Sequence, residues 1–332
     1  MSSESQATVV RILSLEPHPD GDRLEIAKVP TDYQVVVGKG DFQAGELGVF
    51  IPPDLEVPVD SPLFSFLSGR AKGSSRVRIR ACKFRGVFSC GLLIPSNPSW
   101  VEGQDVTELL GITKYVSPPE LSSGGEDEQN PGYMPVYTDI ESLRKYGNIL
   151  QVGEMIFVTE KCHGANARYV FRDSRLWCGS HKNIKRDDPK SIWWNAARYH
   201  GLAEKLAPYP DLILYGEVYG QVQDLKYDIP KGEVRLIIFD AMDFSTKRYL
   251  PWSQTEDLCR RLDLPTIPIL HYGAWNPSLA GLAEGNSVLG NGTCLREGIV
   301  IRPEQERWDP QVGRVILKLH GEGYLTRKER KT

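Results

Sequence analysis

A lysine near the middle of the chain has the surroundings that a nucleophile needs. Lys161 follows residues 155–159, an apolar and β-branched run that, with Val152, predicts a buried strand. Gly164 lets the backbone approach a ligand closely. A lysine attacks only after its ammonium group has lost a proton, so its pKa of roughly 10.4 must fall through burial or nearby positive charge. The pattern predicts a nucleophilic lysine at a strand end, and a solvated loop lysine is the alternative for so short a motif.

Four downstream segments combine strand-like apolar patterns with carboxylates, an aromatic residue and a second lysine. They are residues 214–220, 237–240, 296–302 and 315–320. Together with residues 160–166, their order resembles the covalent nucleotidyltransferase superfamily of polynucleotide ligases and capping enzymes, whose first motif is Lys-x-(Asp/His)-Gly. The histidine at the third position, and the asparagine two residues after the glycine, resemble RNA ligases that seal breaks within duplexes.

The resemblance implies a role for each anchor residue. Lys161 would attack the α-phosphorus of ATP to form lysyl-AMP, a reaction that asks the protein for positioning and charge neutralisation. Glu217 would accept from the ribose hydroxyl, Phe239 would stack on adenine, and Lys318 would contact the α-phosphate. Glu297 would hold a hydrated Mg²⁺ or Mn²⁺. For each residue judged separately, a salt bridge or a core position is the alternative.

Three further residues complete the expected catalytic site. His163 stands where many relatives carry aspartate, and its neutral ring would bind substrate or metal water in the later steps. Asp240 would be an acidic companion of the metal or of the first motif. His320 departs from the family pattern, which has a lysine there, so a fixed positive charge is missing.

The candidate site residues have four expected roles. The catalytic residues are Lys161, Glu217, Glu297, Lys318 and His163. The nucleotide-binding residues are Glu160, Lys161, Cys162, Asn166, Arg168, Glu217, Phe239, Lys318 and His320. The metal ligands are Glu297, Asp240 and His163. The nucleic-acid or phosphate contacts are Arg144, His181, Lys182, Lys185, Arg76, Arg78 and Arg80.

The charge of the chain gives only local support for a nucleic-acid partner. The net charge of −3 does not distinguish a nucleic-acid binder. Residues 76–80 alternate arginine with apolar residues, so a strand there would project three arginines from one face, which fits a phosphate backbone. A second basic run occupies residues 327–331, and a solvated face is the alternative for each run.

The length of 332 residues predicts two domains, each with its own core. Residues 1–116 contain short strand patterns between Gly, Pro and Asp turns, which predict a small closed barrel. Residues 117–135 are an acidic Pro/Gly/Ser-rich linker with too few apolar residues to pack. Residues 136–332 alternate apolar strands with helices expected at 139–146, at 192–205 and, behind a Ser253 cap, at 254–262.

The expected fold class is α+β: an N-terminal OB-like β-barrel followed by a mixed α+β nucleotidyltransferase domain of the ATP-grasp-like ligase kind. Residues 18–24 and 83–91 resemble the OB modules of tRNA-binding proteins. An OB domain placed before the ligase motifs resembles the Naegleria-type RNA ligases. Such a barrel either binds nucleic acid or is a structural appendage, and both alternatives stay open.

Composition narrows the class of protein. The chain is 40% hydrophobic and 25% charged, with no apolar run of roughly 18 residues, so we expect a soluble protein and no membrane partner. The first residues lack a signal-peptide pattern. Six scattered cysteines without a Cys-x-x-Cys pair fit a reducing cytoplasm rather than a zinc site or a disulfide framework. We also expect a monomer.

The leading hypothesis is an ATP-dependent RNA ligase that seals 3′-OH/5′-phosphate breaks, in particular nicks in duplex RNA, in RNA repair. A DNA or mixed-substrate nick ligase is the alternative within the same class. A catalytically silent nucleic-acid-binding protein is the alternative from another class. The four charged anchors Lys161, Glu217, Glu297 and Lys318 favour an enzyme, because a binding module does not need all of them.

Overall fold

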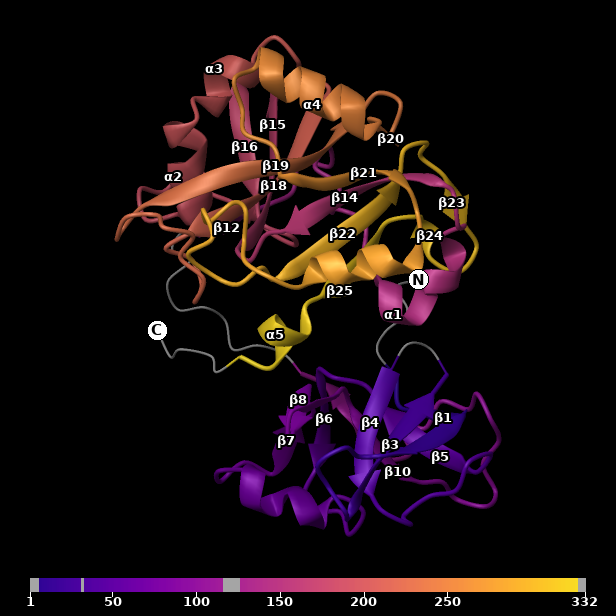
Figure 1. Cartoon of the computed structure of the whole chain (residues 1–332). Coiled ribbons are helices and arrows are strands. Elements are labelled where there is room, and N and C mark those ends of the chain that lie inside the picture. The colour runs from indigo at the N-terminus through magenta and orange to yellow at the C-terminus, as the bar shows by residue number, and fades with distance from the viewer. Residues whose placement is uncertain (1–5, 31–32, 116–125, 328–332) are drawn as a thin grey trace. The chain divides into compact units, whose positions relative to one another are not determined.

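The computed structural model describes residues 6–30, 33–115 and 126–327 (Figure 1). The chain forms two compact units, Met1–Pro118 and Pro119–Thr332. The expected α+β class, with a strand-rich first part and a mixed second part, is confirmed. None of the helices in the described ranges is long and apolar enough to cross a bilayer.

The first unit consists of short antiparallel strands. Their sheets are β1 (Thr8–Arg11), β5 (Leu47–Ile51) and β10 (Leu92–Pro95); β2 (Ser14–Pro17), β3 (Leu24–Val29) and β4 (Tyr33–Gly38); β11 (Thr113–Lys114), β6 (Leu55–Pro58) and β7 (Arg76–Arg78); and β8 (Cys82–Phe84) with β9 (Val87–Ser89). A 3-10 helix, η1, spans Ser65–Arg70. Strand β5 buries Val49 and Ile51 in one core and Phe50 in another, as the two-residue period of a strand requires.

The second unit is built on two sheets. The seven-stranded sheet has the order β12 (Asp127–Glu128), β17 (Ile184–Lys185), β16 (Arg175–Gly179), β15 (Ala165–Arg172), β18 (Leu212–Gly220), β19 (Val234–Asp243) and β20 (Arg248–Tyr249). The five-stranded sheet has the order β13 (Glu141–Ser142), β25 (Leu317–His320), β22 (Gly298–Pro303), β14 (Met155–Lys161) and β21 (Ile269–Ala274). A separate hairpin joins β23 (Trp308–Asp309) to β24 (Gly313–Arg314).

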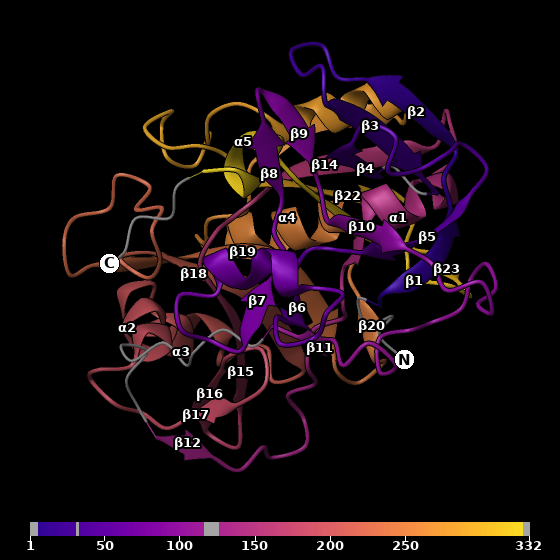
Figure 2. The ribbon, with the colours of Figure 1, turned by 90° about the horizontal axis from the view of Figure 1, so that it is seen from below.

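Three helices pack against the seven-stranded sheet. They are α2 (Ile192–Tyr199), α3 (Leu202–Leu206) and α4 (Trp252–Arg261), and Figures 1 and 2 show α2 and α3 following one another beside β15 and β16. The predicted helix over residues 192–205 is interrupted at Gly201, whose φ of 63° lies in the left-handed region. Helix α4 begins at Trp252, so Ser253 lies inside the helix instead of capping it.

In the five-stranded sheet β14 lies between the edge strand β21 and the central strand β22. The 3-10 helices η2 (Gly147–Ile149) and η3 (Pro277–Ala283) and helix α1 (Leu143–Tyr146) contribute side chains to its core. The helix predicted over residues 139–146 is shorter than expected, because Glu141 and Ser142 pair with β25 as a strand. Val152 lies outside β14, with 76% of its surface exposed.

Part of the predicted linker is packed structure. Linker residues 117–125 lie outside the described ranges. Asp127 and Glu128 form β12, which pairs with β17. Met134 is fully buried in the second unit. The expectation that the linker cannot pack was therefore wrong for residues 126–135, because β12 pairs at the edge of the seven-stranded sheet and Met134 packs against side chains of its inner strands.

Gly298 is a close-packing position at the junction of β22 and β25. A Cβ added there would lie 2.0 Å from the Leu319 carbonyl oxygen. We expect Gly298→Ala to lower the free energy of unfolding by about 1–3 kcal/mol, because the strands must separate to admit the methyl group. Urea unfolding measures the change. Gly281→Ala is the matched control, since nothing lies within 4 Å of its added Cβ, and an equal loss in both variants would contradict the packing argument.

Candidate active site

A pocket of about 370 Å³ lies between the two sheets of the second unit. This volume falls within the roughly 300–1,000 Å³ typical of small-molecule sites. Strands β14, β15, β18, β19, β22 and β25 each contribute to its wall. The lining residues are Tyr137, Thr138, Asp139, Ile140, Thr159, Glu160, Lys161, Cys162, Asn166, His181, Glu217, Phe239, Ile267, Val300, Arg302 and Lys318. The structure therefore brings together most of the residues that the sequence predicts for the nucleotide site.

Lys161 is the last residue of β14, and its ammonium group faces a carboxylate. Its Nζ lies 2.9 Å from Oε2 of Glu297, and the two side chains are 24% and 6% exposed. The Glu297 Oε2 is buried and has no hydrogen-bond partner among the described residues, so the contact is an ion pair without hydrogen-bond alignment. Gly164 lets β15 approach β18, since an added Cβ would lie 2.2 Å from the Val218 carbonyl oxygen.

Glu217, Lys161 and Lys318 line the pocket, and Glu297 lies behind the wall beside Lys161, so that these four charged groups shift one another's pKa values. Burial lowers the pKa of Lys161, but the carboxylates of Glu297 and Glu217 raise it more, so the net pKa is above its usual value. Burial raises the pKa of Glu217 to about 8, against the opposing effect of Lys161. Burial and the charge of Lys161 lower the pKa of Lys318. The neighbouring carboxylates therefore favour the charged form of Lys161 in this ligand-free structure.

Phe239 reaches the pocket through a β-bulge. Tyr215 pairs with Asp240 and Gly216 pairs with Ile238, so Phe239 is the extra residue between them. A bulge re-aims side chains locally, and Phe239 lines the pocket with its ring centroid 5.0 Å from that of Tyr137 in an edge-to-face contact. An aromatic wall is thus available for a flat ligand.

Asn166 presents an unused polar atom to the same pocket. Its Oδ1 is buried and has no hydrogen-bond partner within the described ranges. Its backbone oxygen accepts from Trp193 Nε1 at 3.0 Å, which fixes the strand position. Since buried polar atoms are nearly always satisfied, the free Oδ1 fits a site that binds a polar ligand.

Glu160 and Cys162 flank the lysine and line the pocket, and the Glu160 carboxylate also holds a neighbouring loop. The Glu160 carboxylate accepts from the backbone N–H of Val288 at 2.8 Å and from the Ser287 hydroxyl. It thereby anchors the loop beside β14. Cys162 is buried, and burial raises the pKa of its thiol well above the usual value.

Arg168 does not belong to the nucleotide site. The side chain is fully buried and donates to the backbone oxygens of Ser180, Lys182 and Met134. Three carbonyl acceptors satisfy this guanidinium, so its predicted role in nucleotide binding was wrong. Arg168 on β15 instead connects residues 134, 180 and 182, because their backbone oxygens accept hydrogen bonds from its buried side chain.

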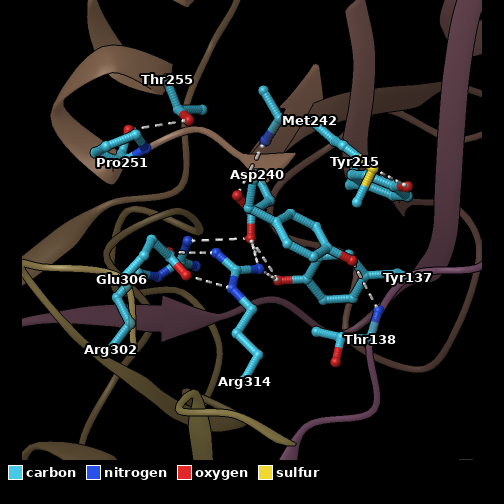
Figure 3. Close-up of polar contacts among 12 residues, drawn as sticks. Tyr137, Thr138, Tyr215, Asp240, Met242, Pro251, Thr255, Arg302, Glu306 and Arg314 are labelled. Atoms are coloured by element: carbon cyan, nitrogen blue, oxygen red, sulfur yellow. Dashed lines mark hydrogen bonds and ion pairs between the residues drawn. The ribbon is translucent and has the colours of Figure 1, made fainter. Parts of the chain in front are cut away.

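Asp240 also differs from its expected role as a metal ligand (Figure 3). Its Oδ2 accepts from the Tyr137 hydroxyl and from Arg314 Nη1, both at 2.6 Å, and from Arg302 Nη1 at 3.3 Å. Its Oδ1 accepts from the Ala241 N–H. With both oxygens engaged and two guanidinium groups adjacent, the carboxylate does not suit a cation. The prediction that Asp240 is a metal ligand was therefore wrong.

His163 lies beside Glu297 with both ring nitrogens engaged. Its Nε2 is 2.7 Å from Asp224 Oδ1, its Nδ1 is 3.0 Å from the Tyr324 hydroxyl, and its Nδ1 is 3.7 Å from Glu297 Oε1. Neither nitrogen is open to a metal, which argues against the predicted ligand role. Glu297 remains the carboxylate that fits a divalent ion, because its Oε2 lacks a hydrogen bond. Among the described residues, no group of three or more His, Cys, Asp and Glu side chains is arranged to hold a metal ion.

His320 occupies the position expected for a second fifth-motif lysine. Its Nε2 lies 3.6 Å from Glu297 Oε1, and its ring stacks on Tyr324 with centroids 5.9 Å apart. Burial lowers the pKa of His320, which favours the neutral ring. The fixed charge that a lysine would supply is therefore absent here.

The basic residues expected to contact phosphates fall into different settings. His181 lines the pocket and its pKa is lowered by burial. Lys185 is paired with Asp127 at 2.5 Å, and Lys182 is exposed. Arg144 Nη2 lies 3.9 Å from Glu322 Oε1. Of this group, the structure brings only His181 into the pocket.

The predicted arginine strip in the first unit is partly used for internal contacts. Arg76 donates to the backbone oxygens of Glu56 and Gly111, and Arg78 pairs with Asp54 at 2.6 Å. Strand β7 ends at Arg78, so Arg80 does not continue the alternation. The three arginines therefore do not form the uniform face that a longer strand would present.

Several pocket and support residues were not among the predicted site residues. Arg302 and Tyr137 line the pocket, and Asp224 and Tyr324 contact His163 from 61 and 161 positions away. Arg302 is the last residue of the predicted segment 296–302 and lies on β22, so its place in that motif was the available clue. Asp224 lies in a loop, where periodicity does not identify a partner.

Asp240 balances two buried arginines, and its removal should destabilise the protein. We expect Asp240→Ala to lower the free energy of unfolding by about 3–5 kcal/mol, because Arg302 and Arg314 lose their shared carboxylate. Urea unfolding measures the change. Asp257→Ala, which removes an exposed carboxylate paired with Arg260, should cost at most about 1 kcal/mol. A loss of that small size at Asp240 would argue against its anchoring role.

Glu217 should make the stability of the ligand-free protein fall as pH rises. With a native pKa of about 8 against a usual 4.5, the native state holds a proton that the unfolded state has lost between these values. Relative to Glu217→Gln, the parent should lose roughly 1.4 kcal/mol per pH unit between about pH 5 and pH 8. Urea unfolding across that range measures the slope. Parallel curves of stability against pH for parent and variant would mean that Glu217 is already ionised in the native state. The control is Glu204→Gln at an exposed position, whose curve should run parallel to that of the parent.

Both units of the chain match known protein families. An RNA ligase family model matches residues 154–320, half of the chain, and an OB-fold domain model matches residues 6–96. The chain is similar to the Naegleria gruberi RNA ligase solved with pyrophosphate, at 25% identity and a TM-score of 0.82, covering 97% of this chain and 98% of that one. A lysine-to-alanine variant of the same ligase with ATP and manganese matches at 25% identity and a TM-score of 0.83, over 96% and 98% of the two chains.

A curated relative is the phenylalanine–tRNA ligase beta subunit of Latilactobacillus sakei, 24% identical over 231 residues. The match covers 59% of this chain and 26% of that protein. The chain therefore spans about a quarter of the length of that relative. The family match includes Lys161, the Glu297 that pairs with it, and Lys318 on the neighbouring strand. An OB-fold domain thus precedes the ligase domain in this chain, and the chain belongs to the RNA ligase family.

Proposed function

We propose that this protein is an ATP-dependent RNA ligase that joins 3′-hydroxyl and 5′-phosphate ends through a lysyl-AMP intermediate. The observation that carries the proposal is the ion pair between Lys161, which lines a pocket of about 370 Å³, and the buried Glu297 beside it. The structures of the Naegleria gruberi ligase with ATP and manganese support ATP and a divalent ion as cofactors.

In the first step, the Lys161 nitrogen attacks the α-phosphorus of ATP. A nitrogen–phosphorus bond forms, the bond to the bridging oxygen breaks, and pyrophosphate leaves. The lysine must first release its proton, which Glu297 at 2.9 Å opposes in the ligand-free state. A divalent ion held by Glu297 through water would supply positive charge that compensates this carboxylate and the phosphates. Lys318 adds charge from the adjacent strand.

Nucleotide recognition follows from the remaining pocket residues. Phe239 offers its ring to adenine, and the unpaired Asn166 Oδ1 accepts from a ribose hydroxyl. Glu217, with a pKa of about 8, is largely protonated at neutral pH in the free protein, so it donates as well as accepts toward the ribose. These contacts hold the α-phosphorus in line with Lys161, which is the main demand of phosphoryl transfer.

In the later steps, AMP passes to the 5′-phosphate of the RNA, and the 3′-hydroxyl then attacks that phosphorus and releases AMP. We propose nicks in duplex RNA as the substrate and RNA repair as the role. The OB-fold domain supports this assignment, since such domains commonly bind nucleic acids. We also propose that the protein acts as a monomer. A reducing cytoplasm is part of the same proposal, supported by six cysteines that are all free.

Incubation with α-labelled ATP and Mg²⁺ or Mn²⁺, followed by denaturing electrophoresis, tests the first step. The parent should retain label on the protein, and Lys161→Ala should lose it entirely because the nucleophile is gone. The exposed Lys190→Ala is the matched control and should label like the parent. A parent without label under either metal would sink the enzyme proposal and favour a nucleic-acid-binding protein.

The same preparations then test the substrate on nicked duplexes that differ only in the sugars beside the break. Sealing should require 2′-hydroxyls near the 3′-OH end, because these groups distinguish RNA from DNA. Equal sealing of an all-DNA nick would replace the RNA assignment with a mixed-substrate ligase. Deletion of residues 1–116 should reduce sealing while leaving lysine labelling intact, and undiminished sealing would remove the first domain from substrate binding.

A further inference from the structure

The imidazole of His163 is held from both sides, with a partner at each ring nitrogen. Nε2 lies 2.7 Å from Asp224 Oδ1, and Nδ1 lies 3.0 Å from the Tyr324 hydroxyl. An ionised carboxylate only accepts hydrogen bonds, so Nε2 must carry the hydrogen. In the neutral ring Nδ1 is then an acceptor, and the Tyr324 hydroxyl donates to it.

Asp224 is itself fixed as an anion by a bidentate contact. Arg327 donates through Nε at 3.0 Å and Nη2 at 3.1 Å to the two carboxylate oxygens. Burial raises the pKa of Asp224, but the Arg327 hydrogen bond and charge, with His163, lower it more. The Arg327 guanidinium also lies 3.6 Å from the Tyr324 ring centroid, so one residue orders both partners of His163.

The partners come from a segment that is anchored at the pocket edge. Tyr324 belongs to the short helix α5 (Glu322–Leu325). The Glu284 carboxylate accepts from the backbone N–H groups of Glu322 and Gly323, which fixes the start of that helix. His163 in turn places its Nδ1 3.7 Å from Glu297 Oε1, next to the carboxylate that pairs with Lys161.

We propose that Asp224 is a positioning residue that holds His163 in the Nε2–H tautomer beside Glu297, with Tyr324 and Arg327 completing the hold. Asp224 does not line the nucleotide pocket, so it acts through His163 and not by touching ATP. The inference rests on the proposed function for its effect on rate, but the tautomer itself is a property of the free protein. It also gives residues 322–327 a role in the active site.

Nitrogen-15 NMR of the full chain labelled at histidine tests the tautomer directly. The parent should show His163 as a single Nε2–H tautomer, identified by loss of its signals in His163→Ala. Asp224→Asn should shift these signals toward a tautomer mixture, because the anion that selects Nε2–H is gone. Asp228→Asn makes the same chemical change at an exposed position of the same loop and should leave the spectrum unchanged. An unaltered His163 tautomer in Asp224→Asn would overturn the inference.

Kinetics of lysine labelling test whether the hold matters to the reaction. Asp224→Asn should lower the maximal labelling rate about tenfold with little change in the KM for ATP, while Asp228→Asn matches the parent. In a His163→Ala background, Asp224→Asn should have no further effect, since Asp224 acts only through that ring. Additive losses, or an unchanged rate in Asp224→Asn, would contradict the inference.

A second variant guards against a folding defect in Asp224→Asn. Tyr324→Phe removes only the hydroxyl that donates to Nδ1, and it should lower the maximal rate about threefold while urea unfolding stays close to that of the parent. A parental rate in Tyr324→Phe would argue against the hold. A parent that never labels would sink the ligase proposal instead, and the NMR result would still decide the tautomer.

Discussion

The ion pair between Lys161 and Glu297 is the constraint on which the rest of the ligase domain depends. Bringing a lysine and a glutamate out of water is costly unless each finds a partner, so the two strand ends that carry them must stay in register. Strand β14 pairs Lys161 with Gly298, the residue after Glu297, and β25 continues the sheet to Lys318 and His320. Close approach at Gly298 therefore positions three motifs at once.

The same ion pair sets the protonation of Lys161 in the ligand-free protein. Glu297 and Glu217 raise the pKa of Lys161 more than burial lowers it. In the proposed reaction, positive charge that arrives with the nucleotide and its metal ion would compensate these carboxylates and favour the neutral lysine. The proposed function thus links the reactivity of Lys161 to binding through electrostatics.

A second buried cluster supports the wall of the pocket. Asp240 joins Tyr137 to Arg302 and Arg314, and Arg314 also pairs with Glu306 at 2.5 Å (Figure 3). The cluster connects β19 of the seven-stranded sheet to β22 of the five-stranded sheet. Phe239 lines the pocket, and the next residue, Asp240, holds the two sheets together.

The sequence by itself determined the main apolar strands, the order of the ligase motifs, the leading barrel and the candidate nucleophile, because these depend on residue type and on neighbours close in the chain. The short strands at Glu141–Ser142 and Asp127–Glu128 depend on pairing with distant segments, and the sequence did not predict them. Only the tertiary structure decided which polar side chains face the pocket. Asp240 and Arg168 carry the residue types of a binding site, yet contacts from distant segments bind them internally. His163 acquires Asp224 and Tyr324 across 61 and 161 positions. Periodicity gives no information about partners so far apart, because their approach is decided by how the two sheets pack.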